Sequence, residues 1–245
     1  MTVGAASDSG KIRQRNEDSY MVLYDQPGLP NVFVIADGMG GHSSGETASK
    51  LAVDHVSEYV MANPEAFMRE TEIRDSLIVM MRNTNRLIME CSETSDAWRG
   101  MGTTLTVAVI IDAHLYIGHV GDSRIYLLDT DGMRKITRDH SYIEELVQSG
   151  EISMEQARNH PDRNVITRAI GGGDEDMMAD TYTSRLTEGC HVLLCTDGLT
   201  NEVDETVIQQ IIREAASPQD ACENLIRAAN DHGGRDNITV IILRC

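Results

Sequence analysis

Residues 32–38 read VFVIADG, five apolar residues followed by Asp37 and Gly38. A short, continuous apolar run is consistent with a buried strand, and Asp-Gly marks a tight exit from it. Residues 192–198, VLLCTDG, repeat the pattern and end in Asp197 and Gly198. A turn after a strand explains each Asp-Gly when it is taken alone. Two such strands together favour carboxylates that project into a shared cleft.

Helical periods occur in two blocks of the chain. Apolar residues recur there at spacings of three and four, which is typical of helices with one face on a core. The helices expected from this spacing cover about residues 44–60, 73–91, 204–215 and 218–232. Ser217 is a suitable N-cap, with Pro218 at the first helical position, and Gly233 is a suitable stop for the last helix.

Strands are predicted between and after the helices. Residues 103–111 read TTLTVAVII and are dense in the β-branched side chains that strands favour. The other strands expected are residues 114–120, 123–128, 133–137, 191–195 and 238–243. Residues 141–173 are polar, with short helical stretches and few core anchors. The whole pattern indicates an α+β fold in which helices cover antiparallel sheets.

Length and charge narrow the classes of function. At 245 residues the chain lies at the upper end of a single domain, so we expect one domain over 1–245. The net charge of −18 argues against a nucleic-acid partner and against an anionic membrane surface. The five cysteines are odd in number and lack a CxxC pair, which predicts reduced thiols in the cytoplasm. We expect no membrane span, because no apolar run reaches roughly 18 residues.

Four loops carry carboxylates next to predicted strands. Asp37 and Asp197 follow strands, whereas Asp236 precedes residues 238–243 and Asp18 ends the run Asn-Glu-Asp at 16–18. Carboxylate oxygens are the ligands that hard cations such as Mg²⁺ prefer. The sequence therefore predicts a cation site where these loops meet.

Eight segments of the chain resemble the protein phosphatase 2C family, the metal-dependent phosphatases, and especially its compact bacterial members. The segments are SDSGKIRQRNED (7–18), VIADGMGGHSSGETAS (34–49), MGTTLTVAVI (101–110), HVGDSRIYLL (119–128), DHS (139–141), HPDRNVITRAIG (160–171), LLCTDGLT (193–200) and GGRDNITVIIL (233–243). The resemblance implies a central antiparallel β-sandwich flanked by helices on both faces, in four layers (α-β-β-α). It also implies that residues 141–173 form an irregular flap beside the active site.

The resemblance implies two divalent cations, Mn²⁺ or Mg²⁺, at the acidic loops. Asp37 would bridge both ions, and the carbonyl of Gly38 would bind one of them. Asp197 and Asp236 would hold the first ion. Two cations ~3.5–4 Å apart polarise phosphoryl oxygens and lower the pKa of a bridging water, whose hydroxide can attack phosphorus directly.

Three further acidic residues have looser assignments. By the resemblance, Asp18 and Glu17 would act at the second ion through bound waters. Asp122 matches a position that can hold a third, weaker ion together with Asp197. An ordinary hairpin aspartate that hydrogen-bonds the following backbone is the alternative interpretation of Asp122.

Arg13 and His42 complete the expected active site. The family spacing, five residues before Asp18, selects Arg13 over Arg15 as the arginine that grips the substrate phosphate. A planar guanidinium can meet two phosphate oxygens at once. His42 is the candidate general acid for the leaving group. In the animal-type pattern the histidine directly follows Asp-Gly, whereas this chain has Met39 at that position and His42 three residues later. A contact to the substrate or to the loop is therefore the alternative role of His42.

The resemblance implies a protein phosphatase that acts on phosphoserine and phosphothreonine. Its partners would be phosphorylated proteins and a cognate serine/threonine kinase, and we expect a cytoplasmic monomer. The alternatives are a catalytically weak relative that binds phosphoproteins and a hydrolase of small phosphate esters. The complete set of aspartates argues against the first alternative, because degenerate relatives lose metal ligands. The active-site residues alone do not exclude the second, since substrate choice depends on surface and flap.

Overall fold

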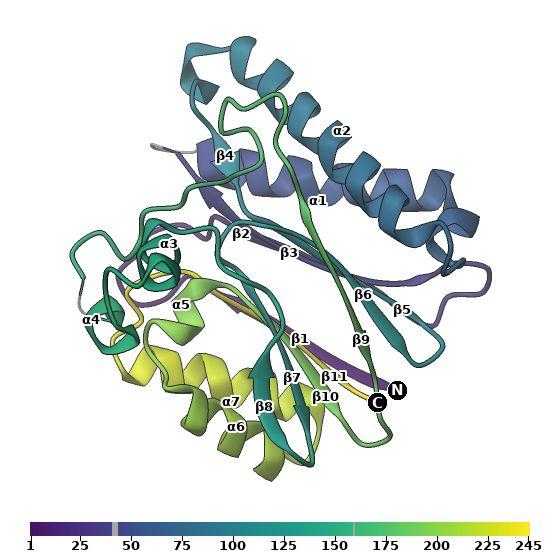
Figure 1. The fold of residues 1–245 in the computed structure, drawn as a ribbon, viewed down its shortest axis with the longest axis vertical. Coiled ribbons are helices and arrows are strands. Elements are labelled where there is room, and N and C mark those ends of the chain that lie inside the picture. Colours follow the sequence, from purple (N-terminus) through teal and green to yellow (C-terminus); the bar gives the residue numbers. More distant parts are fainter. Residues whose placement is uncertain (41–43, 159) are drawn as a thin grey trace.

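The computed structural model describes residues 1–40, 44–158 and 160–245, and in these two antiparallel sheets pack face to face (Figure 1). The first sheet has the strand order β1 (Thr2–Asp8), β11 (Ile238–Arg244), β10 (His191–Cys195), β7 (Arg124–Asp129) and β8 (Gly132–Lys135). The second has the order β2 (Asp18–Leu23), β3 (Asn31–Met39), β5 (Leu105–Ile111), β6 (His114–Val120) and β9 (Asp180–Arg185). The short β4 (Gly102–Thr103) pairs with the end of β3.

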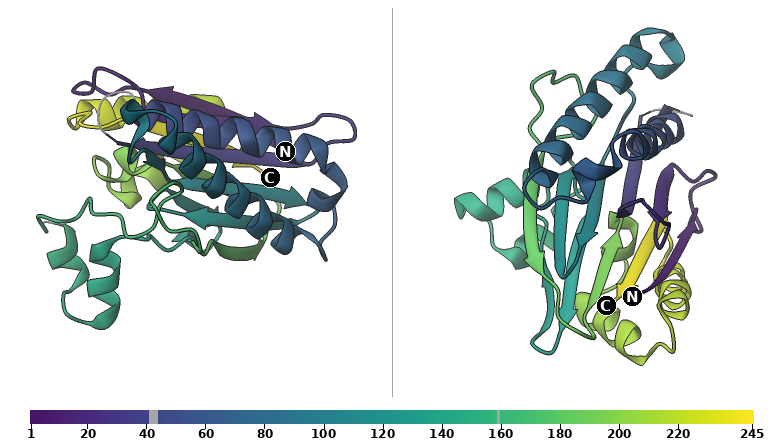
Figure 2. Two further views of the ribbon diagram at one scale, coloured as in Figure 1. Left: turned by 90° about the horizontal axis from the view of Figure 1, so that it is seen from above. Right: turned by 90° about the vertical axis from the view of Figure 1, so that its right-hand side faces the viewer.

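Helices cover the outer face of each sheet. On the second sheet lie α1 (Ser44–Ala62) and α2 (Ile73–Glu93), and on the first lie α6 (Glu205–Glu214) and α7 (Pro218–Asp231). The turned views in Figure 2 show the resulting helix, sheet, sheet, helix order. The α+β sandwich in four layers is therefore confirmed. Short helical turns lie at Pro64–Phe67 (η1), Asp96–Trp98 (η2) and Asp197–Thr200 (α5).

The apolar runs at residues 32–36 and 192–195 are strands buried on both faces. In β3, Val32, Val34 and Ala36 pack into the core under α1 and α2. Phe33 and Ile35 point the other way, into the core between the sheets. Each fully buried aliphatic or aromatic side chain contributes about 1.5–3 kcal/mol by leaving water. Since both faces of the strand are covered, its sequence is apolar at every position rather than at alternate ones.

The strands that the sequence analysis did not predict are β1, β2 and β9, and each lies at the edge of a sheet. Their side chains are mostly half-buried, unlike those of β3 and β10. An edge strand with one open side has no need of a continuous apolar run, so its hydrophobic signal is weak. A simple turn, the alternative interpretation of Asp197-Gly198, is not found, because the chain enters α5 there.

The predicted helices and the remaining strands are confirmed within a few residues. The last helix, α7, begins after Ser217, whose hydroxyl oxygen accepts a hydrogen bond from the N–H of Asp220 at 3.1 Å. Pro218 occupies its first turn, as the sequence predicts.

The flap, residues 141–173, contains the short helices α3 (Tyr142–Ser149) and α4 (Met154–Arg158) and stands away from the sandwich in Figure 2. Ser141 caps α3 by accepting a hydrogen bond from the N–H of Glu144 at 3.3 Å. At the flap's other end, Thr103 and Ile170 exchange two backbone hydrogen bonds of 2.9 Å. The flap thus has a fixed base.

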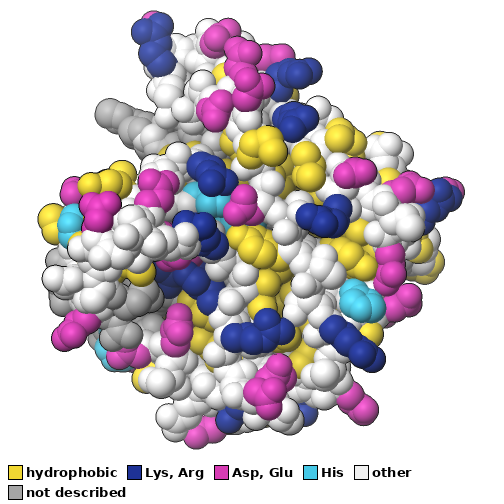
Figure 3. Space-filling model, in the orientation of Figure 1, with side chains coloured by type: hydrophobic (Ala, Val, Ile, Leu, Met, Phe, Trp, Pro, Cys, Tyr) yellow, Lys and Arg dark blue, Asp and Glu magenta, His cyan; other side chains and the backbone are white. Residues whose placement is uncertain are grey.

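Acidic and basic side chains are interspersed over the face seen in Figure 3, where the acidic ones form no single patch. None of the helices in the described ranges is long and apolar enough to cross a membrane.

Candidate active site

Five aspartates gather at one end of the sandwich because the strands that carry them begin or end there. Asp37 near the end of β3 pairs directly with Asp18 at the start of β2. Asp197 follows β10, Asp236 precedes β11, and Asp122 lies in the turn between β6 and β7. The carboxylates of Asp18, Asp197, Asp122 and Asp236 are close enough to disfavour the charge of Asp37. We call these residues the aspartate cluster.

The backbone of Asp37 is fixed by buried threonines. Its N–H donates to Thr104 Oγ1 at 2.9 Å, and its carbonyl accepts from the N–H of Thr104 and the hydroxyl of Thr103, each at 2.9 Å. Having accepted from Asp37, the Thr104 hydroxyl can donate to Ser123 Oγ at 2.8 Å. The carboxylate of Asp37 therefore projects from a rigidly held backbone. Thr103 lies near the site because it holds this backbone.

Gly38 is required by a close approach of two elements. Its N–H donates to the carbonyl of Glu17 at 3.1 Å. A side chain at Gly38 would overlap the carbonyl of Gly45 in the first turn of α1. Only glycine allows the helix and the strand end to meet this closely.

A hydrogen bond across the two sheets holds Asp18. The hydroxyl of Thr196, directly after β10, donates to Asp18 Oδ2 at 2.9 Å. The same hydroxyl oxygen accepts from the N–H of Thr239 at 3.0 Å. Asp197 next in the chain accepts from Asn201 Nδ2 at 2.9 Å. Thr196 therefore links the carboxylate of one sheet to the strand ends of the other.

Burial and crowding disfavour the charged form of these carboxyls. Burial raises the pKa of Asp18 to about 7, against the hydrogen bond from Thr196, and the charge of Asp197 adds to the rise. Burial also raises the pKa of Asp37 and of Asp122 well above their usual values, and neighbouring carboxylates add to both shifts. A cation among the carboxylates would relieve this repulsion.

The donor atoms of the cluster fit a hard divalent cation. Within the described residues, Oδ1 of Asp18, of Asp122 and of Asp197 is buried and has no hydrogen-bond partner. An orphaned buried carboxylate oxygen is costly unless a ligand satisfies it. In the same part of the chain, no three acidic, histidine or cysteine side chains form a ready-made cage. An ion bound here would therefore keep water or carbonyl ligands as well, as Mg²⁺ commonly does.

Arg13 lies at the solvent side of the cluster. Its Nη2 is 2.9 Å from Asp236 Oδ2, and about half of its side chain is exposed. Arg15 is directed elsewhere, with its Nη1 3.7 Å from Glu46 Oε2. Glu17 is half-buried, and burial raises the pKa of its carboxyl. The expected general acid, His42, lies outside the described residues.

Asn237 holds the loop that carries Arg13 and Glu17. Its Oδ1 accepts from the N–H of Glu17 at 2.7 Å, and its Nδ2 donates to the carbonyls of Ser9 and Arg15 at 3.0 and 2.8 Å. From the sequence, Asn237 is expected to orient a metal ligand, and its N–H does donate to Asp236 Oδ1 at 2.9 Å. The partners of its side chain lie more than 200 positions away in the chain, so no local pattern shows them.

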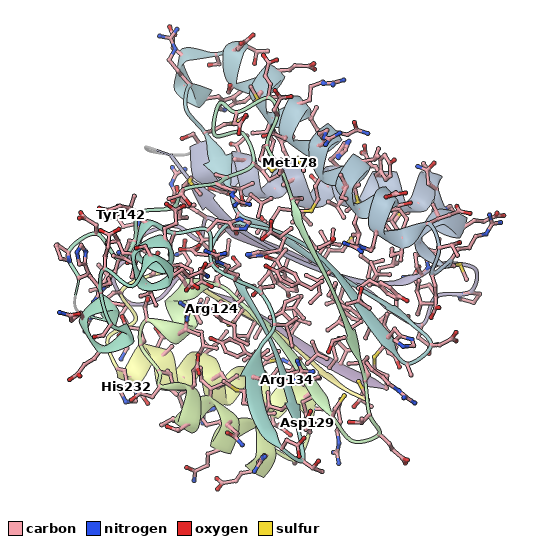
Figure 4. All side chains as sticks on the ribbon, viewed as in Figure 1. Arg124, Asp129, Arg134, Tyr142, Met178 and His232 are labelled. Atoms are coloured by element: carbon pink, nitrogen blue, oxygen red, sulfur yellow. The ribbon has the colours of Figure 1, made fainter. Side chains whose placement is uncertain are left out.

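A cavity of about 500 Å³ opens between the flap and the aspartate cluster. Asp122 and Asp197 line one side of it, and Ile143 and Val147 of α3 line the other. Arg124 lies in its wall, between β7 and the flap helix that begins at Tyr142 (Figure 4). The cavity connects the reaction centre with the flap.

An ion-pair group forms the wall around Arg124. Arg124 Nε and Nη2 both donate to Asp139 Oδ2, at 2.9 and 2.7 Å. Lys135 Nζ lies 3.1 Å from Asp139 Oδ1. Burial alone would raise the pKa of Asp139, but the two cations outweigh it and hold the pKa below its usual value. Arg124 therefore ties the turn after β6 to Asp139, next to the base of the flap.

The comparisons with known proteins agree with this geometry. The protein phosphatase 2C family matches residues 11–230. Serine/threonine phosphatase stp of Listeria monocytogenes serotype 4b (strain F2365) is 38% identical over 237 residues, which cover 97% of this chain and 93% of that protein. The structure of Stp1 from Staphylococcus aureus superposes with a TM-score of 0.92 at 30% identity, covering 99% of this chain and 94% of that one.

A third relative was solved with metal. The catalytic domain of the phosphatase PstP, in complex with two manganese ions, has a TM-score of 0.85 to this chain at 31% identity, covering 98% of this chain and 96% of that one. Fold and near-complete sequence coverage agree. This chain belongs to the protein phosphatase 2C family of serine/threonine phosphatases.

Proposed function

We propose that this phosphatase hydrolyses phosphoserine and phosphothreonine on proteins at the aspartate cluster, with two divalent cations as cofactors. The observation that carries the proposal is the set of buried oxygens of Asp18, Asp122 and Asp197 that have no partner among the described residues, with Arg13 beside them. Bound Mn²⁺ or Mg²⁺ would supply Lewis acidity and a more acidic water. The PstP structure with two manganese ions supports this choice of cofactor.

The residues divide the work of holding the cations. Asp37, on its fixed backbone, would serve both ions, and the Gly38 carbonyl would serve one. Asp197 and Asp236 would hold the first ion. Asp18 and Glu17 are assigned to the second ion through water, in keeping with the absence of a ready-made cage among the described side chains. Asp122, whose Oδ1 is buried and unpartnered in the described part of the chain, is assigned to a third, weaker site.

Arg13 binds the substrate phosphate in this proposal. Its exposed guanidinium lies at the rim of the cluster, where a phosphate would enter from solvent. Two of its N–H groups can meet two phosphate oxygens, which orients the phosphorus toward the cluster. His42 stays the predicted proton donor to the leaving serine or threonine oxygen. A pH–rate profile that keeps its shape in His42→Ala would remove it from that role.

The substrates we propose are phosphorylated proteins, including a serine/threonine kinase and the targets of that kinase. The chain would act as a monomer in the cytoplasm. Its five cysteines are free thiols, three of them buried, which suits a reducing compartment.

Phosphate release from a phosphothreonine peptide and from p-nitrophenyl phosphate, each with Mn²⁺ and with EDTA, tests this function. We expect turnover of both substrates with Mn²⁺ and none with EDTA. Turnover of the small ester alone would point to a small-ester hydrolase. Binding of the peptide without release would point to a phosphoprotein-binding relative. Equal turnover with EDTA would contradict a metal-dependent reaction.

A further inference from the structure

His140, at the base of the flap, contacts three separate parts of the fold. Its side chain is buried, with 3% exposed. Its Nδ1 lies 3.1 Å from the N–H of Gly121, and its Nε2 lies 3.2 Å from Asp180 Oδ2 on β9. Its backbone carbonyl accepts from the N–H of Thr167 at 2.8 Å. One residue thus contacts the turn that precedes Asp122, the strand β9 and the far end of the flap.

The hydrogen bonds determine which nitrogen of His140 carries the proton. A backbone N–H can only donate, so Nδ1 must accept from Gly121, and the proton of the neutral ring is on Nε2. Nε2–H then donates to Asp180. Arg168 Nη1 is 3.4 Å from Nε2, but both atoms are donors, so the guanidinium bonds Asp180 Oδ1 at 3.1 Å instead.

The turn that His140 holds has little freedom to adjust. Gly121 has a φ of +110°, which side chains rarely tolerate, and a Cβ there would overlap the side chain of Thr104. Thr104 is the residue that bonds both to Asp37 and to Ser123. The N–H of His140 also donates to the Gly121 carbonyl at 2.8 Å. Both polar groups of the Gly121 backbone are therefore bound by His140.

We propose that His140 is a positioning residue whose Nδ1 holds the N–H of Gly121 and so fixes Asp122 against the cation site. This inference rests on the proposed function of Asp122. It gives the flap's base a direct link to the reaction centre, since His140 also binds Thr167 and Asp180. His140 does not touch the reacting atoms in this scheme and acts through Gly121.

Two substitutions separate the two hydrogen bonds of the ring. In His140→Asn, the amide oxygen can take the place of Nδ1 and accept from Gly121, while the contact to Asp180 is lost. In His140→Gln, the longer amide can reach Asp180 and leaves the Gly121 N–H without an acceptor. His55→Asn is the control, since His55 is half-buried and its Nδ1 bonds Thr84 Oγ1 at 2.9 Å, between α1 and α2. His119 is unsuitable, because its ring centroid lies 4.9 Å from that of His140.

The test combines steady-state kinetics on p-nitrophenyl phosphate with amide exchange of Gly121 measured by NMR. We expect His140→Gln to lower kcat about tenfold, the scale of one unsatisfied buried donor, with little change in KM. Its Gly121 amide should exchange faster. His140→Asn should keep both values near those of the parent and of His55→Asn.

Equal losses in the Asn and Gln variants, or a Gly121 amide unchanged in His140→Gln, would overturn the proposal. The two hypotheses can fail separately. If the parent protein does not release phosphate, the proposed function fails, while the exchange rates still decide whether His140 holds Gly121.

Discussion

The aspartate cluster and the flap face each other across one cavity, and they differ in how they are supported. Asp37 and Asp197 extend from strands whose side chains are buried on both faces. In α3 of the flap, Ile143 is the buried residue, and most of its neighbours are half or fully exposed. The flap is held instead at its base, by Asp139 and His140.

This difference suits two kinds of task. Chemistry at phosphorus needs carboxylates fixed to within a fraction of an ångström, and a core buried on both sides provides that. Recognition of varied protein substrates benefits from a segment that adjusts to each of them. The contrast predicts that changes in the cluster, or in His140 that holds it, affect kcat. Changes in the other residues of the flap and its base should affect stability or KM.

The largest effect is expected for Asp37→Asn. The substitution removes the carboxylate that is proposed to serve both cations, while it keeps the shape and the backbone hydrogen bonds. We expect kcat to fall by about 10²–10³-fold, as for loss of one preorganised electrostatic group. Steady-state kinetics on p-nitrophenyl phosphate measures this loss, with circular dichroism as a check of the fold. Near-normal turnover would mean that the cluster is not the reaction centre.

Next in size is the effect of Asp139→Asn on stability. The change leaves the half-buried Arg124 without its full counter-charge, so the unfolding free energy should fall by about 2 kcal/mol, the scale of a hydrogen bond between charged groups. The folded pKa of Asp139 lies below the unfolded one, near 3.9. Its stabilisation is therefore complete above that pH and is lost as the pH falls through the lower folded value. Urea unfolding at pH 7 and at pH 3 should show the difference between parent and variant shrinking in acid.

A smaller effect separates the two arginines of the loop 9–17. Arg13→Ala should raise KM for a phosphopeptide about tenfold, since it removes a hydrogen bond between charged groups. Arg15→Ala, the matched control, should change KM far less, because Arg15 lies near Glu46. Initial-rate kinetics on the two variants measures the contrast. A larger effect at Arg15 would reverse the assignment.

The smallest effect is expected for Val147, a side chain of the flap that lines the cavity. Val147→Ala removes part of an apolar surface that lines it. We expect KM for phosphopeptides to rise about threefold, in line with a partly buried loss of two methyl groups. Turnover of p-nitrophenyl phosphate, which is too small to span the cavity, should stay the same. An equal change for both substrates would place Val147 in support of the chemistry rather than of recognition.

Whether a structural feature can be predicted from the sequence depends on whether a local pattern of residues or a contact with a distant part of the chain determines it. The motifs VFVIADG and VLLCTDG predict strands because a strand buried on both faces must be apolar throughout. Asp37 and Asp197 lie at the ends of these apolar runs. The edge strands β1, β2 and β9 carry no such run. The four acidic loops indicate a cation site from the residues alone, whereas the division of roles among them came from the family resemblance.

The contacts that hold the site residues in place cannot be predicted from local sequence patterns. Asn237 binds Glu17, 220 positions away, and Thr196 binds Asp18 at a separation of 178. His140 appeared in the sequence only as part of the short motif DHS. Its bond to Gly121 depends on how the flap's base returns to the turn after β6, and this is a property of the tertiary fold.

The central claim is that the aspartate cluster binds divalent cations, and calorimetric titration of Mn²⁺ into EDTA-stripped protein tests it most directly. We predict binding of two ions in the parent protein and weakened binding in Asp37→Asn. At about 100 times Kd, one bound ion should stabilise the fold by about 2.7 kcal/mol and raise Tm. Absence of binding heat, with a Tm that neither Mn²⁺ nor EDTA changes, would contradict the account.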